Sequence, residues 1–188
     1  FILNNYGMNI SNAISGQIDK IIIAPILGFE LLGNYALALQ FLVVMMMASN
    51  IIFKYLLTHE SSGNNTKKLR IYTILFSIFM SAFGFLILPE IIPIVFPEFI
   101  SSIIAIQIVS LIVIPGTITL LYESKFLALE KSKFIVISKV IEALIIIIGF
   151  LTLGIEFGML GLAFTILIGA CVEAGLLVIF NRILINKQ

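Results

Sequence analysis

Long uninterrupted apolar runs alternate along the chain with short polar connections. A helix needs about 20 mainly apolar residues to cross a bilayer, and six runs are long enough to do so. They cover residues 6–27, 33–57, 71–92, 100–122, 134–153 and 158–181. The runs lack the period-two alternation typical of membrane barrel strands. The pattern therefore predicts an all-α fold of six transmembrane helices that form a single lobe over residues 1–188.

Composition supports the same interpretation. Of the 188 residues, 61% are hydrophobic and 11% are charged, whereas soluble domains carry about 25% charged residues. So few charges could not cover the surface of a soluble protein of this size, which indicates an integral membrane protein. The net charge of +1 gives no sign of a nucleic-acid partner, and a single cysteine cannot form a disulfide framework or a thiolate metal site.

The charges of the connections alternate in sign along the chain. Eight of the eleven basic residues fall in the loops 58–70 and 123–133 and in the tail after the last run. The other three connections, 28–32, 93–99 and 154–157, contain acidic residues and no basic ones. The positive-inside rule places the basic loops and both ends of the chain in the cytoplasm. We expect a multi-pass protein of the plasma membrane.

The first run carries a polar stripe. On a helical wheel, six of its residues fall within an arc of about 100°, namely Asn5, Asn9, Asn12, Gly16, Asp19 and Lys20. Such a stripe faces a protein interior or a water-filled cavity, because it does not face lipid. Either Asp19 and Lys20 line a substrate or ion pathway, or they pair with charges on neighbouring helices and only fix the packing.

Three more ionisable residues lie inside later runs: Lys139, Glu142 and Glu173. A charge at mid-bilayer costs about 2.5–3.5 kcal/mol on insertion scales, so each of them needs a partner or a function. Lys139 and Glu142 are three positions apart and could pair on one helix face. Together with Asp19, the residues Glu142 and Glu173 are candidate ligands for a coupling cation.

Prolines interrupt two of the runs, at Pro25 and Pro115, and three more fall in the stretch Leu88–Phe99. Proline removes a backbone donor and kinks a helix. Both a hinge and plain packing are consistent with the two internal prolines. The Leu88–Phe99 stretch predicts a broken outer helix end followed by a short interfacial turn.

Enzyme chemistry has no support in the sequence. No HExxH, GxSxG or phosphate-binding glycine motif is present. The single histidine, His59, stands beside Glu60 in a loop, where a solvated pair is the simpler interpretation. We expect neither a cofactor nor a metal site.

Two segments resemble a known transporter family. The stretch "SGQIDKIIIAPILGFELLGNYALALQF" is similar to the start of the second half of polysaccharide exporters of the multidrug/oligosaccharidyl-lipid/polysaccharide superfamily. The family's polar helix with an acid, its glycine turn and its G-x-Y-x-x-A motif correspond here to Asp19, Gly28, Gly33, Tyr35 and Ala38. The stretch "GIEFGMLGLAFTILIGACVEAGLL" resembles the family's G-x-x-G-x-A turn into the last helix, through Gly158, Gly161 and Ala163.

The resemblance implies one lobe of a two-lobe flippase. Such exporters rock between inward-open and outward-open states and carry lipid-linked oligosaccharides across the membrane. One lobe cannot give alternating access by itself, so the expected partner is a preceding N-terminal lobe or a second copy. Asn12, Asp19, Lys20 and Lys139 would then bind the lipid-linked saccharide. Only two of these residues are cations, fewer than the family's usual cationic cavity for a diphosphate.

Two alternatives remain at this stage. The chain could belong to a cation-coupled exporter of small molecules in the same superfamily. It could also be a membrane scaffold subunit that transports nothing, in which the buried charges serve packing alone.

Overall fold

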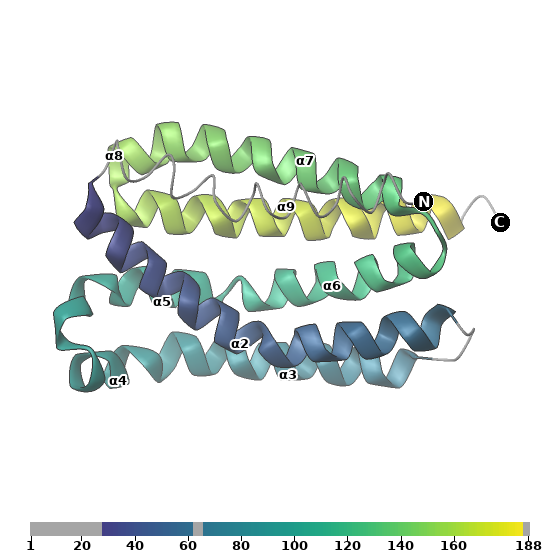
Figure 1. Ribbon diagram of the computed structural model, residues 1–188, viewed down its shortest axis with the longest axis horizontal. Helices are drawn as coiled ribbons and strands as arrows, with labels where there is room; N and C mark the ends of the chain where they lie inside the picture. The colour runs from purple at the N-terminus through teal and green to yellow at the C-terminus, as the bar shows by residue number, and fades with distance from the viewer. Residues whose placement is uncertain (1–27, 62–65, 186–188) are drawn as a thin grey trace.

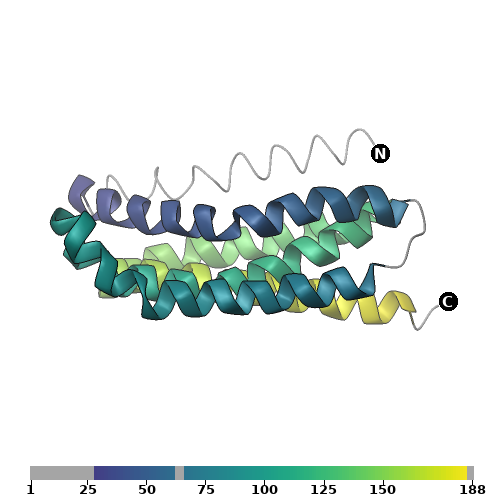
Figure 2. The ribbon, with the colours of Figure 1, turned by 90° about the horizontal axis from the view of Figure 1, so that it is seen from below.

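The computed structural model describes residues 28–61 and 66–185, and every regular element in these residues is a helix (Figure 1). The helices run up and down in an elongated bundle. In the view of Figure 2, turned by 90°, the long helices still lie along one common axis. The all-α prediction is confirmed. The predicted first span, 6–27, lies outside the described residues.

The described elements overlap the last five predicted runs and extend past several of their ends. In chain order they are α2 (Phe29–Ser61), α3 (Lys67–Leu86), α4 (Leu88–Val95), the 3₁₀ helix η1 (Pro97–Ser102), α5 (Ile103–Ser110), α6 (Val113–Ala128), α7 (Ser132–Gly149), the π-helical turn η2 (Phe150–Gly154), α8 (Ile155–Phe157) and α9 (Met159–Ile185).

Four described helices are long and apolar enough to cross a membrane: α2, α3, the continuous segment Ser132–Phe157 and α9. A fifth span is possible if the bent pair of α5 and α6 counts as one. The described residues therefore contain four or five candidate spans and leave the predicted number of six untested.

The bend between α5 and α6 measures 42°. It falls just before Pro115, whose ring displaces the carbonyl four residues earlier, that of Leu111. The chain tightens at this point, since the backbone N–H of Ile112 donates to Val109 three residues back at 3.0 Å. The kink expected at Pro115 is thus present as a 3₁₀-like turn between two helices.

The Leu88–Phe99 stretch forms the end of the bundle, as its prolines predict. Pro89 stands in the first turn of α4, where its missing N–H has no partner to lose. Pro97 begins η1, which leads into α5. Short helices therefore replace an extended loop at this end.

The boundary of the predicted 123–133 loop is wrong. Helix α6 continues to Ala128, and only residues 129–131 form the turn, with Glu130 at φ 57°. The extended part of α6 is held by packing: Phe126 is fully buried and clusters with Ile135 of α7 and Leu177 of α9.

Helix α3 shows the pattern typical of a membrane helix, with small or polar residues on its buried face and large apolar residues on its exposed face. Its buried positions are small or polar, at Thr73, Ser77, Ser81 and Gly84, whereas large side chains such as Phe79 are exposed. Small residues let helices approach closely where lipid rather than water surrounds them. The hydroxyls of Thr73 and Ser77 donate to carbonyls of their own helix at 2.8 Å, so α3 buries no unsatisfied hydroxyl at these two positions.

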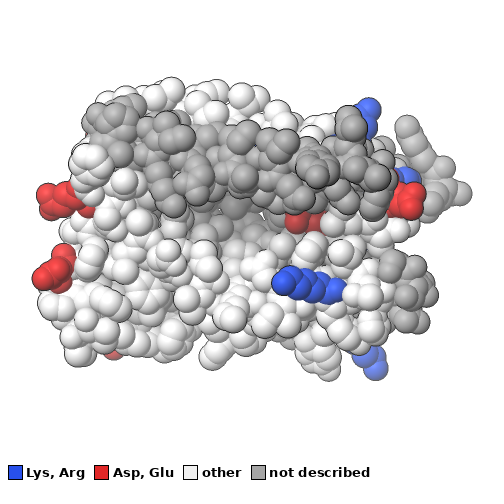
Figure 3. All heavy atoms as spheres, viewed as in Figure 1, with Lys and Arg blue, Asp and Glu red and all other residues white. Residues whose placement is uncertain are grey.

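Charges separate between the two ends of the bundle. On the face in Figure 3, basic side chains lie in the half that contains the α2–α3 and α6–α7 connections, while the opposite end shows only acidic ones. The helices thus bring the basic connections to one end, here called the basic end. This is the arrangement expected of a multi-pass protein that follows the positive-inside rule.

Candidate functional site

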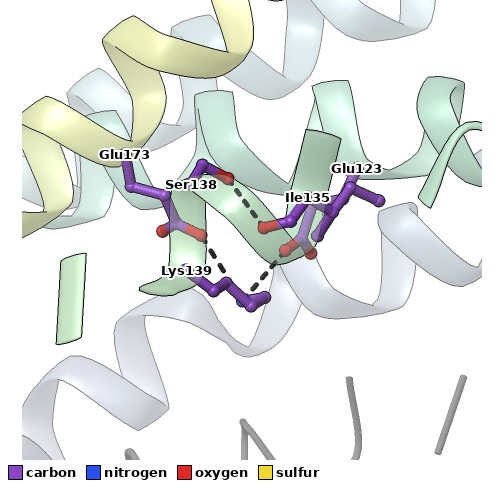
Figure 4. Close-up of polar contacts among 5 residues, drawn as sticks. All are labelled: Glu123, Ile135, Ser138, Lys139 and Glu173. Carbon is purple, nitrogen blue, oxygen red and sulfur yellow. Dashed lines mark hydrogen bonds and ion pairs between the residues drawn. The ribbon is translucent and has the colours of Figure 1, made fainter. Parts of the chain in front are cut away.

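Ionisable side chains from three helices meet inside the bundle: Glu123 of α6, Lys139 of α7 and Glu173 of α9 (Figure 4). The Nζ atom of Lys139 lies 3.0 Å from Oε1 of Glu123 and 3.5 Å from Oε1 of Glu173. Glu123 is 6% exposed and Glu173 is 5% exposed. We call these three residues the ion-pair cluster.

Lys139 and Glu173 stand next to buried small residues on their own helices. On α7, the residue before Lys139 is the buried Ser138, whose hydroxyl donates to the carbonyl of Ile135 at 2.9 Å (Figure 4). On α9, Glu173 stands between the buried small residues Ala170 and Ala174. Small side chains at this spacing bring a helix close to its neighbours, which shortens the reach from Glu173 to Lys139.

An apolar layer seals the ion-pair cluster toward the basic end. Phe126, Ile135 and Leu177, each fully buried, form one contact cluster. Each stands about one helical turn from a member of the ion-pair cluster on the same helix, on the side nearer the basic end. The three charges are therefore separated from water at that end by a layer of side chains from the same three helices.

Glu142 adds a third carboxylate beside the ion-pair cluster. A methyl group built on Gly169 of α9 would lie 3.4 Å from Cγ of Glu142, so this side chain packs against α9 one turn before Glu173. It is near enough to Lys139 for their charges to interact. The region thus holds three carboxyl groups around one ammonium group.

The predicted pair of Lys139 with Glu142 is replaced by other partners. Among the described residues, Lys139 forms its ion pairs with Glu123 and Glu173. Neighbouring helices supply these two carboxylates, and tertiary packing brings them within 3.5 Å. A pairing along one helix is worth only about 0.2–0.5 kcal/mol, so it competes poorly.

Sequence reasoning missed Glu123 because it assigned this residue to a cytoplasmic loop. The missed signal is the helical spacing that continues past residue 122. Thr119 and Glu123 stand four positions apart on the buried face of α6, followed by the buried Phe126. A helix extended by two turns would have placed Glu123 inside the bundle.

Of the predicted site residues, the structure brings Lys139, Glu142 and Glu173 into one region. The predicted residues Asn12, Asp19 and Lys20 lie outside the described part of the chain.

Further polar contacts join the helices. Lys125 donates from Nζ to Oδ1 of Asn181 at 2.7 Å, which links α6 to α9 near the basic end. The hydroxyls of Ser49 and Thr117 lie 2.9 Å apart and link α2 to α6. In lipid such contacts hold helices together where hydrophobic burial cannot.

The chemistry of the site suits cations better than anions. The ammonium group of Lys139 is engaged by two carboxylates, so it is not presented to a phosphate. The region contains more carboxyl groups than ammonium groups. Within the described ranges, no set of three His, Cys, Asp or Glu side chains is arranged to hold a metal ion.

No protein-family model matches the chain, and searches of curated proteins and of solved structures likewise found no match. The fold and the site alone therefore describe its class: a bundle of long apolar helices, of the kind that crosses a membrane several times, with a buried ion-pair cluster.

Proposed function

We propose that this chain is one lobe of a membrane transporter that flips lipid-linked saccharide precursors across the plasma membrane by alternating access. The ion-pair cluster carries the transporter part of the proposal. Ionisable groups within membrane helices are costly and typically mark transport pathways or coupling sites. The choice of substrate comes from the two segments that resemble polysaccharide exporters.

In this mechanism the lobe moves largely as one body. Glu123, Lys139 and Glu173 tie α6, α7 and α9 together, while the bend before Pro115 would serve as a hinge for the α5 end. Asn12 and Asp19 would line the cavity and bind sugar hydroxyls, and Lys20 would attract the phosphates. Lys139 would serve charge balance inside the lobe, since its partners are carboxylates.

A second candidate is a cation-coupled exporter of small molecules. The excess of carboxylates around Lys139 favours it, because Glu142 and Glu173 could offer charge to a coupling ion. The two candidates share a fold and differ in cargo.

The test compares variants of the full-length protein in cells. Asp19→Ala, Lys20→Ala and Glu173→Gln should each reduce surface polysaccharide while protein levels stay normal. Glu98→Gln, a change of the same kind on an exposed side chain at the acidic end, should leave export intact. Normal export by all three site variants would refute the site assignment. Accumulation of a cationic drug without a polysaccharide defect would favour the second candidate.

The accessibility of the first predicted helix to water distinguishes a transporter from a scaffold without transport activity. Single cysteines at positions 5, 9, 12, 16 and 19 should react with a water-soluble maleimide if the first helix lines a hydrated cavity. Absence of labelling at all five positions would favour the scaffold.

A further inference from the structure

A cavity of about 540 Å³ opens between the last turns of α2 and the start of α3, at the basic end of the bundle. It is separate from the ion-pair cluster, which α6, α7 and α9 form. Its volume falls in the range typical of small-ligand sites, about 300–1,000 Å³.

The lining changes character along the helix axis. Ile51 and Ile52 of α2 form its deeper part, and the α2 end contributes Tyr55 and His59. The two rings stack with centroids 4.0 Å apart. Aromatic side chains with a polar tip gather where the bilayer core meets water. The cavity therefore runs from apolar depth to a polar mouth, like the membrane interface itself.

The mouth carries a basic side chain. Lys68 lines it from α3 and is exposed, and it forms no ion pair with any described residue. Lys67 and Arg70 stand one and two positions away on the same helix, so the start of α3 is rich in basic residues. The described lining includes no carboxylate. The complementary ligand is an anion that also carries an apolar portion.

We propose that this cavity binds one anionic phospholipid from the leaflet at the basic end. The phosphate lies at Lys68 and His59, and an acyl chain follows Ile51 and Ile52. Basic pockets between membrane helices on the cytoplasmic side are suited to anionic head groups. A soluble phosphate would leave the apolar depth of the cavity unused. The site is additional to any transport pathway through the lobe and does not depend on the nature of the cargo.

The experiment uses the full chain in nanodiscs of phosphatidylcholine, with or without phosphatidylglycerol, and counts retained lipids by native mass spectrometry. The wild type should retain phosphatidylglycerol in preference to phosphatidylcholine. Lys68→Gln should weaken phosphatidylglycerol binding about tenfold, the factor corresponding to about 1.5 kcal/mol for one hydrogen bond to a charged group. Lys68→Arg should preserve binding.

Two further variants separate a built site from general attraction. Lys133→Gln removes the same charge from an exposed position at the same end and should leave retention unchanged. Ile51→Trp fills the cavity without altering charge and should likewise weaken retention of phosphatidylglycerol. Equal losses in Lys68→Gln and Lys133→Gln would overturn the proposal, because they would indicate diffuse surface attraction. So would equal retention of both lipids by the wild type, or full displacement of phosphatidylglycerol by inorganic phosphate.

Discussion

Replacing Lys139 with methionine would remove the cation of the ion-pair cluster and keep most of its apolar stem. At separations of 3.0 and 3.5 Å, Coulomb's law with an effective dielectric constant of about 20 gives about 5 kcal/mol of attraction for each pair. Desolvation of the three groups offsets most of this gain. The remaining carboxylates, 6% and 5% exposed, would keep their desolvation cost and lose their counter-ion. We therefore expect Lys139→Met to lower the free energy of unfolding by about 3–5 kcal/mol.

The neutral replacement of the whole cluster should behave differently. Glu123→Gln and Glu173→Gln combined with Lys139→Met remove all three charges at once. Replacing a complete buried ionic group with neutral side chains is often neutral or stabilising. We expect the triple variant to recover to within about 1 kcal/mol of the wild type, well above the single variant.

Unfolding of the purified chain in mixed micelles, followed by circular dichroism as the denaturing detergent increases, measures these differences. Lys133→Met, at an exposed position of the same helix, is the matched control and should change little. If Lys139→Met lowered the free energy of unfolding by less than about 1 kcal/mol, the cluster would contribute no more than an exposed ion pair does. That result would refute the argument from burial. A triple variant as unstable as the single one would show that packing of the lysine stem, rather than charge, is responsible.

Two other predictions concern the turns and the orientation. Gly161→Ala should lower stability by about 2 kcal/mol, because a methyl group there overlaps a backbone carbonyl of η2. Gly33→Ala, where the added methyl group meets open space, should leave stability unchanged or raise it by up to about 1 kcal/mol. Thermal melts that show the reverse order would contradict the packing. In a Cys171→Ser background, a cysteine at Glu98 should react with an impermeant maleimide added to intact cells, and one at Lys133 only after the membrane is opened; labelling of both from outside would contradict the orientation.

The sequence predicts the helices well because each span depends mainly on local hydrophobicity. It fails at Glu123, where a charged residue inside a helix looks like the start of a loop. It also fails to pair Lys139 correctly, because the partner depends on which helix faces which. One clue was accessible: Glu123 and Lys139 stand at similar distances from the turn at 129–131. Antiparallel helices joined by a short turn bring such residues to the same height.

The approach of α9 to α7 could be anticipated only in part. Small residues at Ala170 and Ala174 predict a close helix contact but do not identify the facing helix. The apolar layer of Phe126, Ile135 and Leu177 draws one residue from each of three helices. No local pattern groups residues so far apart in sequence, so the enclosure of the ion-pair cluster emerges from the tertiary structure alone.

Helix α3 buries small and polar residues and exposes large apolar ones. A more hydrophobic residue therefore does not make this helix more stable at its buried positions. Ser77 packs in a tight interface and already satisfies its hydroxyl within its own helix. Leucine there would raise the insertion tendency of the segment and yet force the neighbouring helix away. Alanine would fit the space and sacrifice little. Larger apolar side chains at the inward positions of α3 would therefore lower the stability of the fold. At these positions, the space available between the helices matters more than the hydrophobicity of the side chain.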